Sequence, residues 1–444
     1  MAQKRLGIVV GGGPAPGINA VIGSATIEAI NRGFEVIGIY DGFRHLVSDS
    51  FDPAEHVVRL LIPMVARVHF EGGSILRTAR ANLLDESKLK TSTQATPDPG
   101  KVERVLGHLR QLGINALLTI GGDDTALSAR FIADAGHGSI RVVHCPKTID
   151  NDLPLPHGVS TFGFETALNI GTQLVKNLMR DSQTTGRWYF VSAMGRSAGW
   201  LAQGIAQAAG ATVAVIPEEF AAHSTVAQVA DVLEGAVLKR RIQGRPDGVA
   251  VIAEGVVYKL GDRQELERLL GHAVPVDAAG HLRLSEVPLV DMLKREVERR
   301  FEARGDKLAV VTHTLGYELR SADPTPHDMK YCRSLGWGAI QILLDDAPGA
   351  PAGRMVTLIN DNLVPMDFHQ MIDPATNRTQ VRLVNIDSDN YRVARAYQIR
   401  LERSDFDNVD LLGKLAAEAK LTPAEFTQRY ARAATRLHDM APAT

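Results

Sequence analysis

Short apolar runs recur along the first half of this chain, and each ends in a glycine-rich or charged turn. The first run, Leu6–Val10, passes through the glycines of residues 11–17 into a helical pattern over 18–31. Three further runs of this kind lie at 34–40, 114–120 and 141–145. Such runs are typical of strands that are buried on both faces. Strands and helices that alternate in this way predict an open parallel sheet, with ligand-binding groups at the carboxyl ends of its strands.

The second half of the chain repeats the strand pattern and predicts a second α/β layer. Its apolar runs lie at 188–193, 211–216, 248–253 and 308–312. The charged segment 261–302 reads as helical, and its run Lys294–Arg300 alternates in sign, which predicts a solvated helix face. A helix is expected over 334–346, and two short helices are expected from about Asp405 onward. Thr422, with a proline after it and Glu425 three residues on, predicts the start of the second.

Length and charge limit the classes of protein to consider. The 444 residues are too many for one ordinary domain and suit two. The net charge of −2 gives no field that would favour nucleic acid or an anionic membrane. Two cysteines cannot form a disulfide framework, which favours a reducing cytoplasm. No apolar run is long enough for a signal peptide or a membrane span, so we expect a cytoplasmic protein.

Two successive predicted strands end in unusually dense charge. The stretch after the strand 141–145 holds Lys147, Thr148, Asp150 and Asp152, and the strand 114–120 leads into Gly121-Gly122-Asp123-Asp124. A buried carboxylate is costly unless it is paired, hydrogen-bonded or bound to a metal, so we interpret this region as the chemical centre. The alternative is structural: Asp123 or Asp124 caps the helix expected over 126–135, although one aspartate would suffice for that.

Glycine loops suggest where a phosphate would bind. The loop 11–17 lies between a strand and a helix, so its backbone N–H groups and the helix N-terminus can meet a phosphate. The loop 71–80 carries Arg77 and Arg80, whose planar guanidinium groups suit phosphate oxygens. The alternatives are a tight turn without a ligand and arginines that are simply solvated.

Together these residue types suit phosphoryl transfer, which needs positioned phosphates, cationic groups and a base for the acceptor hydroxyl. Asp123 supplies an oxygen ligand of the kind Mg²⁺ prefers. Lys147 supplies positive charge and Thr148 a donor, while Asp150 or Asp152 supplies a base worth roughly 10²–10⁴ in rate. Dehydrogenase chemistry fits less well, because the first loop does not read G-x-G-x-x-G.

Four motifs together resemble the phosphofructokinase family. They are Gly121-Gly122-Asp123-Asp124, Pro146-Lys147-Thr148-Ile149-Asp150-Asn151-Asp152, Met194-Gly195-Arg196 and Leu315-Gly316-Tyr317-Glu318-Leu319-Arg320. The resemblance runs from about Arg5 to Ala339. It implies two Rossmann-like α/β domains with the active site in the cleft between them. The expected domains are 1–157 with 321–400 for the phosphoryl donor, 158–320 for the sugar phosphate, and a helical C-terminal extension over 401–444.

The resemblance also implies roles for individual residues. Asp150 would deprotonate the 1-hydroxyl of fructose 6-phosphate, Asp152 would orient the site, and Asp123 would bind Mg²⁺. Thr148 would contact the moving phosphoryl group. Gly12 and Arg80 would lie at the donor. The sugar phosphate would be held by Met194, Gly195, Arg196, Glu254, Tyr317 and Arg320. Arg187 matches a family arginine that reaches the neighbouring subunit's site, which implies a homodimer or homotetramer.

The residues at 124 and 147 bear on the phosphoryl donor. ATP-dependent family members carry glycine at both positions, whereas the pyrophosphate-dependent type carries Asp and Lys, as this chain does. The side chain of Asp124 would occupy the space of a nucleotide and repel its α-phosphate, while Lys147 can pair with pyrophosphate. The resemblance therefore implies a glycolytic, Mg²⁺-dependent transferase that uses pyrophosphate to phosphorylate fructose 6-phosphate reversibly.

Two departures and two alternatives accompany this interpretation. A second sugar-phosphate arginine of the family falls on Val311, where Lys307 or Arg304 would have to substitute, and Tyr317 stands where many ATP-dependent members have histidine. One alternative is an ATP-dependent phosphofructokinase or a kinase of another ketose phosphate. The other, of a different class, is a catalytically silent homologue that binds sugar phosphate and regulates a partner.

Overall fold

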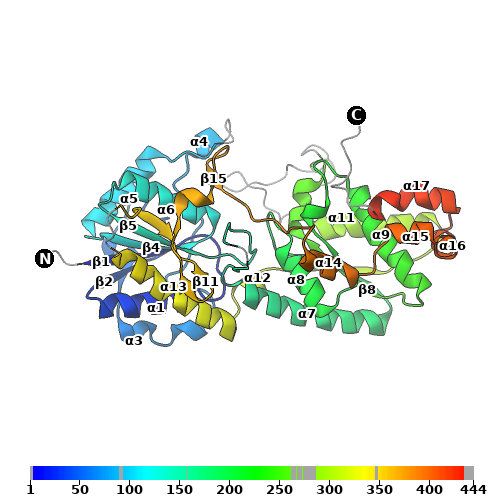
Figure 1. Cartoon of the computed structure of the whole chain (residues 1–444), viewed down its shortest axis with the longest axis horizontal. Coiled ribbons are helices and arrows are strands. Elements are labelled where there is room, and N and C mark those ends of the chain that lie inside the picture. The colour runs from blue at the N-terminus through cyan, green and yellow to red at the C-terminus, as the bar shows by residue number, and fades with distance from the viewer. Residues whose placement is uncertain are drawn as a thin grey trace. The chain divides into compact units, whose positions relative to one another are not determined.

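The computed structural model describes residues 4–89, 94–156, 158–261, 267, 273, 287–345 and 349–434 (Figure 1). The described residues form two compact units. The first unit holds those up to Ala167 and those from Tyr317 to Arg382, and the second holds the rest. The division differs from the expected boundaries. Residues 383–400 belong to the second unit, and the C-terminal helices contribute to its core rather than forming a separate extension.

A seven-stranded sheet forms the middle of the first unit, with the strand order β13-β10-β5-β4-β1-β2-β3. Its strands are β1 (Arg5–Val10), β2 (Glu35–Ile39), β3 (Val57–Leu60), β4 (Ala116–Gly121), β5 (Arg141–Pro146), β10 (Gly353–Met355) and β13 (Met366–Asp367). The five inner strands are parallel, as expected, and β3 and β13 are antiparallel to their neighbours at the two edges. The sheet is therefore mixed rather than purely parallel.

Helices cover both faces of this sheet (Figure 1). Successive side chains of a strand point to opposite faces, so Ile8 packs toward α1 (Ile18–Asn31) and α13 (Pro326–Leu344), while Val9 packs toward the other side. That side is covered by α5 (Pro99–Gln111) and α6 (Asp123–Ala135). Helix α13 begins well before the expected start at 334.

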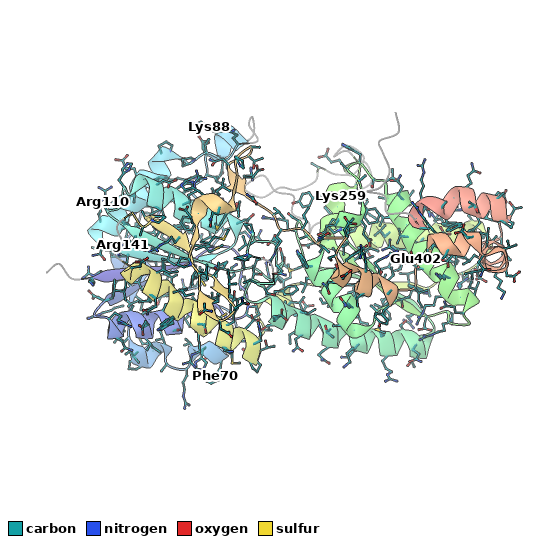
Figure 2. The ribbon with its side chains drawn as sticks, in the orientation of Figure 1. Phe70, Lys88, Arg110, Arg141, Lys259 and Glu402 are labelled. Atoms are coloured by element: carbon teal, nitrogen blue, oxygen red, sulfur yellow. The ribbon has the colours of Figure 1, made fainter. Side chains whose placement is uncertain are left out.

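The remaining elements of the first unit are short. They are α2 (Pro53–His56), α3 (Ile62–Val65), η1 (Val68–Phe70), α4 (Glu86–Leu89), α12 (Tyr317–Arg320), β11 (Leu358–Ile359), β12 (Asn362–Leu363), η5 (Phe368–Met371), β14 (Ile372–Asp373) and β15 (Arg378–Thr379). Phe70 projects from this unit and is 52% exposed (Figure 2).

The second unit contains a parallel four-stranded sheet with the order β7-β8-β6-β9. Its strands are β6 (Trp188–Ala193), β7 (Val213–Val215), β8 (Gly248–Ala253) and β9 (Val310–Leu315). Its other elements are α8 (Trp200–Ala209), η2 (Pro217–Glu219), α9 (Val226–Ile242), η3 (Glu254–Lys259), α11 (Leu289–Ala303), α14 (Asp389–Ala396), α15 (Arg403–Asp407), α16 (Val409–Glu418) and α17 (Pro423–Ala434). Helix α7 (Phe164–Thr185) begins in the first unit and continues in the second.

The C-terminal helices complete the core of the second unit. Leu401, Leu415, Phe426 and Tyr430 are buried in the same apolar cluster as Trp188. In the described part of the chain, up to residue 434, three helices follow residue 402, where two were expected, because α15 adds a short turn before α16. The predicted start of the last helix is confirmed, since the Thr422 and Glu425 side chains and backbone amides hydrogen-bond to each other.

The charged run of α11 is only partly solvated. Arg299 is exposed, but Arg300 is 7% exposed, and its guanidinium binds Asp231 and Glu234 at 2.6 and 2.8 Å. The prediction of a wholly solvated face is therefore wrong for Arg300, whose charge is compensated inside the unit. The rest of the segment 261–302 that was expected to be helical lies outside the described residues, except for a few positions. None of the described helices is long and apolar enough to span a membrane.

Candidate active site

Three loops of the first unit gather at the carboxyl ends of β1, β4 and β5, which are neighbouring parallel strands. The amide of Gly11 donates to the carbonyl of Ile120 at 2.8 Å, and the amide of Lys147 donates to the carbonyl of Gly121 at 2.8 Å. The loop after β1, the Gly-Gly-Asp-Asp turn and the stretch 147–152 are thereby joined directly to one another. The sequence prediction that these motifs share one edge of the sheet is confirmed.

Glycine is required where these loops meet Thr125. A methyl group at Gly11 or at Gly121 would lie 2.3 Å from Oγ1 of Thr125, closer than real side chains approach. Gly12 has a φ of 82°, a left-handed conformation that favours glycine, and its amide donates to the carbonyl of Ala79 at 2.9 Å. The glycines therefore allow the backbone of the loop 11–13 to lie directly beside the backbone of the loop at Ala79 and Arg80.

Lys147 is a buried cation at the carboxyl ends of β1, β4 and β5. Its residue is 5% exposed, and Nζ donates to the carbonyl of Gly13 at 2.5 Å, with Gly12 beside it. Burial lowers the pKa of Lys147 to about 8, opposed by the carboxylates of Asp150 and Asp123. Those two aspartates thus lie within electrostatic reach of the lysine, as the sequence grouping predicted.

Arg320 lies at the same glycine loop. One guanidinium nitrogen, Nη1, is 3.0 Å from the position that a methyl group at Gly13 would take, and the guanidinium stacks over the ring of Tyr317 at 4.7 Å. Arg320 and Arg80 both lower the pKa of Lys147, so the three cations act on one another. Arg320, expected at the sugar phosphate, therefore lies beside the glycine loop 11–13 within the first unit. Tyr317 is 65% exposed.

Asp123 and Asp124 form the first turn of α6, and neither is its N-cap. The helix begins at Asp123, and the capping position is Gly122, which has no side chain to offer. The capping alternative is therefore wrong, although two carboxylates in a first turn do complement the helix dipole. The carbonyl of Asp123 also accepts a hydrogen bond from the Thr379 hydroxyl at 3.2 Å.

The stretch after Lys147 is a tight loop that is stabilised from within. The amide of Asp150 donates to Oγ1 of Thr148 at 3.0 Å, and the hydroxyl of Thr161 donates to the carbonyl of Thr148 at 2.7 Å. Asn151 is buried with a φ of 56°, and its side-chain oxygen accepts the amide of Thr161 at 3.0 Å. The backbone that carries Asp150 and Asp152 is thus fixed on both sides.

A second group of predicted residues lies at the carboxyl ends of β6 and β8, within the second unit. The amide of Gly195 donates to Oε1 of Glu254 at 3.4 Å, and Gly195 has a φ of 139°. A methyl group at Gly255 would lie 2.8 Å from the carbonyls of Gly195 and Arg196. Met194, Gly195, Arg196 and Glu254 are therefore brought together, as the sequence predicted.

Glu218 supports this second group, and sequence reasoning gave it no role. Its carboxylate accepts the amides of Gly199 and Val384, each at 2.9 Å, and the residue is 8% exposed. Burial raises the pKa of Glu218, opposed by these two hydrogen bonds. The cluster Pro217-Glu218-Glu219 at the end of a predicted strand was the available signal.

Arg187 lies at the other end of β6 from Met194, directly before Trp188. Within one chain the structure does not bring it to Met194, Gly195 and Arg196. Val311 lies in β9 and pairs with Tyr189, so no arginine occupies that position.

Of the two proposed substitutes for that arginine, Arg304 is occupied elsewhere. Its Nη1 contacts the fully buried carboxylate of Glu234 at 2.5 Å, and its guanidinium stacks over the ring of Phe301. Lys307 comes before β9 begins, as Arg304 does. Neither residue is placed with the group at 194–196.

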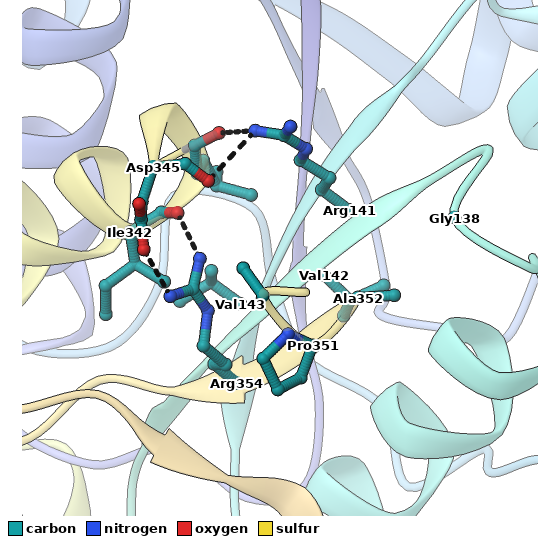
Figure 3. A pocket seen from close by; sticks show the side chains of 11 residues that line it. Gly138, Arg141, Val142, Val143, Ile342, Asp345, Pro351, Ala352 and Arg354 are labelled. Atoms are coloured by element: carbon teal, nitrogen blue, oxygen red, sulfur yellow. Dashed lines mark hydrogen bonds and ion pairs between the residues drawn. The ribbon is translucent and has the colours of Figure 1, made fainter. Parts of the chain in front are cut away.

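A separate cavity of about 200 Å³ lies at the amino end of β5, at the opposite sheet edge from Lys147 (Figure 3). Two arginines line it and bind the end of α13 (Figure 3). Arg141 donates to the carbonyl of Leu343 at 2.8 Å, while Arg354 donates to the carbonyl of Ile342 at 2.8 Å and to Asp345 at 2.7 Å. Cations at a helix C-terminus complement its dipole, so these contacts account for both arginines structurally.

The first unit also offers oxygen ligands for a metal. Among the residues that the structure describes, no three or more His, Cys, Asp or Glu side chains gather to hold an ion by themselves. Mg²⁺, however, is usually held by one or two carboxylates together with substrate phosphates and water. Asp123, in the first turn of α6 and close enough to act on Lys147, fits that kind of site.

Comparison with known proteins gives consistent matches. The family model described as phosphofructokinase matches residues 5–343. A pyrophosphate–fructose 6-phosphate 1-phosphotransferase of Thermotoga maritima is 52% identical over 427 residues, covering 96% of this chain and 98% of that protein. One of the same name from Naegleria fowleri is 41% identical over 433 residues, covering 96% of this chain and 94% of that protein.

A solved structure also resembles this chain. The pyrophosphate-dependent phosphofructokinase from Marinobacter aquaeolei matches with a TM-score of 0.63 and 16% sequence identity, covering 90% of this chain and 92% of that one. At this identity the structural match bears on the fold alone.

Proposed function

This chain belongs to the phosphofructokinase family, and we propose that it transfers a phosphoryl group from pyrophosphate to the 1-hydroxyl of fructose 6-phosphate. The products are fructose 1,6-bisphosphate and phosphate, and the reaction is reversible. The relatives that share this activity in their names match nearly the whole of this chain, which supports the assignment.

One observation carries the choice of donor: the buried ammonium group of Lys147 lies against the Gly12–Gly13 backbone. Arg80 and Arg320 are close enough to affect its pKa, so three cations surround this part of the loop. A compact, highly charged donor such as pyrophosphate suits such a site, because charge-assisted hydrogen bonds to its oxygens are strong. Asp124, in the first turn of α6, adds negative charge that would repel the α-phosphate of a nucleotide.

The chain's own residues supply the remaining steps. Asp150 takes the proton of the 1-hydroxyl as that oxygen forms a bond to one phosphorus of pyrophosphate, and the bond to the bridging oxygen breaks to release phosphate. Thr148 contacts the moving phosphoryl group, and Asp152 orients the site. Met194, Gly195, Arg196 and Glu254 hold the sugar phosphate. Tyr317 is assigned to the sugar phosphate by the family resemblance, and Arg320, at the glycine loop, is proposed to contact phosphate oxygens.

Mg²⁺ is the divalent ion that we propose for this site, with Asp123 as its protein ligand. When bound, it neutralises the charge that develops on the phosphate oxygens. Family phosphotransferases generally need a divalent metal.

We also propose that the active protein is a homodimer or homotetramer. Arg187 lies at the far end of β6 from the residues it would serve, so it requires a second copy of the chain to reach a sugar phosphate. The cytoplasmic location expected from the sequence stays a proposal and is supported by two cysteines that are free and buried.

A donor panel tests this function. Purified protein is supplied with fructose 6-phosphate, Mg²⁺ and either pyrophosphate or ATP, and fructose 1,6-bisphosphate is measured by a coupled assay. Turnover with pyrophosphate and little with ATP is expected. The reverse preference would establish the ATP-dependent alternative, and no turnover with either donor, despite binding of sugar phosphate, would establish the silent homologue.

A further inference from the structure

Arg382 makes several hydrogen bonds to the loop that carries Asp150 and Asp152. Its Nε and Nη2 donate to the carbonyl of Asn151 at 3.1 and 3.0 Å, and Nη2 also contacts the side-chain oxygen of the same residue. Its Nη1 donates to the carbonyl of Val159 at 2.7 Å, and its backbone amide donates to the carbonyl of Asp152 at 2.7 Å. One residue thus fixes the loop and the segment that follows it.

The hydrogen bonds from Arg382 stabilise an unfavourable backbone conformation at Asn151. Its φ of 56° is a left-handed conformation, which residues other than glycine adopt at a cost. Its side-chain oxygen receives hydrogen bonds from two sides, the amide of Thr161 and the guanidinium of Arg382. Because Asn151 stands between Asp150 and Asp152, its conformation determines how the two carboxylates are directed.

The charge of Arg382 matters as well as its shape. Burial lowers the pKa of Arg382, and the carboxylate of Asp152 opposes that lowering, so the two groups attract each other. The planar guanidinium can bind a carbonyl and a side-chain oxygen at the same time. A lysine carries its three donors on one nitrogen, so it cannot place donors on the carbonyls of Asn151 and Val159 as the separate nitrogens of the guanidinium do.

The segment that delivers Arg382 is itself anchored to the other acidic motif. Thr379, in the hairpin of β14 and β15, donates to the carbonyl of Asp123, and the amide of Gln380 donates to the carbonyl of Met371 at 2.8 Å. These residues lie beyond 343, where the family match ends, so none of the motifs that carry the resemblance includes them. The segment 379–382 therefore connects the backbone of the proposed metal ligand, Asp123, to the backbone of Asn151 and Asp152, directly after the proposed base.

We infer that Arg382 is a positioning residue for the phosphoryl-transfer step, acting through Asn151 on Asp150 and Asp152. This inference rests on the proposed function, since it assigns Arg382 to the chemical step of that reaction. It predicts that loss of the guanidinium slows turnover while substrate binding, which involves other residues, changes little.

The test compares the steady-state kinetics of Arg382→Ala, Arg382→Lys and the unmodified protein, with each substrate varied while the other is saturating. For Arg382→Ala we expect kcat to fall 10- to 100-fold, with the KM of each substrate within about twofold of the unmodified value. Arg382→Lys is expected to recover part of kcat, and guanidinium ion added to Arg382→Ala is expected to do the same. Arg392→Ala is the control, because Arg392 is an exposed arginine that pairs only with the exposed Asp389 among the described contacts.

A second readout does not depend on turnover. Amide hydrogen exchange in the peptide 147–156 should rise about tenfold or more in Arg382→Ala and remain unchanged in Arg392→Ala. The inference would be overturned if kcat and amide exchange were both unchanged in Arg382→Ala. It would also be overturned if the variant lost kcat/KM only because KM rose, with kcat unchanged. Failure of the proposed function is distinct, because the unmodified protein would then show no turnover with pyrophosphate while the exchange experiment could still be read.

Discussion

The ammonium group of Lys147 donates a hydrogen bond of 2.5 Å to the carbonyl of Gly13. The lysine comes from the end of β5 and the glycine from the loop after β1, so the contact joins two motifs that are far apart in the sequence. It leaves a buried cation against the backbone of a glycine loop. Electrostatic interaction with a phosphate is stronger there than at an exposed site, because the surroundings are less polarisable.

A double variant with Asp124→Gly and Lys147→Gly tests whether these two residues determine the choice between pyrophosphate and ATP. We expect kcat/KM for pyrophosphate to fall roughly 10- to 100-fold, since a hydrogen bond to a charged group contributes about 1.5–3 kcal/mol. Weak turnover with ATP is also expected, because the space of both side chains becomes free. Steady-state kinetics with each donor checks this, and Lys176→Ala, an exposed lysine, is the control. Unchanged pyrophosphate kinetics in the double variant would refute the assignment.

Asp150→Ser tests the proposed base. Removing a positioned general base is expected to lower kcat by roughly 10²–10⁴-fold. Binding of fructose 6-phosphate, measured by calorimetry, should change little, because Asp150 acts on the hydroxyl that reacts. Retention of more than a tenth of the activity would exclude Asp150 as the base.

The lowered pKa of Lys147 predicts a pH dependence of stability in the metal-free, ligand-free protein. Its pKa is about 8 in the folded protein against an ordinary value of 10.5, so between these values the unfolded chain binds more protons and stability rises with pH. Burying the charged lysine lowers the free energy of unfolding by about 3 kcal/mol. This loss is complete below pH 8 and disappears as the pH approaches 10.5. Denaturant unfolding of the unmodified protein and of Lys147→Met, measured at several pH values, gives this difference. A difference that does not change with pH would contradict it.

Glu218→Ala tests whether Glu218 supports the residues of the second unit that we propose to bind the sugar phosphate. The change leaves the buried amides of Gly199 and Val384 without their acceptor, at roughly 1–3 kcal/mol each. We expect lower stability and a higher KM for fructose 6-phosphate, because Gly199 closes the loop that begins at Met194. Glu218→Gln, which keeps an acceptor oxygen, should restore most of both. Glu302→Ala serves as an exposed control, and an unchanged KM in Glu218→Ala would show that the loop does not depend on this carboxylate.

Mixed oligomers test the role of Arg187. Asp150→Ser and Arg187→Ala proteins should each be nearly inactive as homo-oligomers. If Arg187 serves the site of another copy, dissociating and reassembling a mixture of the two should create sites in which both residues are intact. Recovery of up to about a quarter of the unmodified activity is expected for a dimer mixed at random. No recovery after demonstrated subunit exchange would place Arg187 outside the neighbouring site.

The strands of both sheets could be predicted largely from the sequence, because buried parallel strands are continuous apolar runs. The edge strand β3 was missed, since Val57 and Val58 are only partly buried, Arg59 is exposed, and the segment gives no such run. The hairpins after residue 353 were missed for another reason: their strands are two or three residues long, too short to show a period.

The acidic motifs were grouped correctly, but two kinds of detail could not be read from sequence. The start of α6 was placed three residues late, which made a capping role for Asp123 or Asp124 look available. Arg382 was not singled out at all. Apart from the side-chain oxygen of Asn151, its hydrogen-bond partners are backbone carbonyls, which every residue has, so no pattern of residue types marks the contact.

The division of the chain has a consequence for its synthesis. The first unit takes α13 and β10 from residues that follow the second unit, and the second unit takes its last helices from residues that follow β10. A ribosome therefore releases the segment up to β5 long before the chain holds the helix and strand that cover and extend its sheet. The first unit therefore cannot reach its final form before translation has passed residue 382, and the second unit cannot do so before translation has passed residue 430.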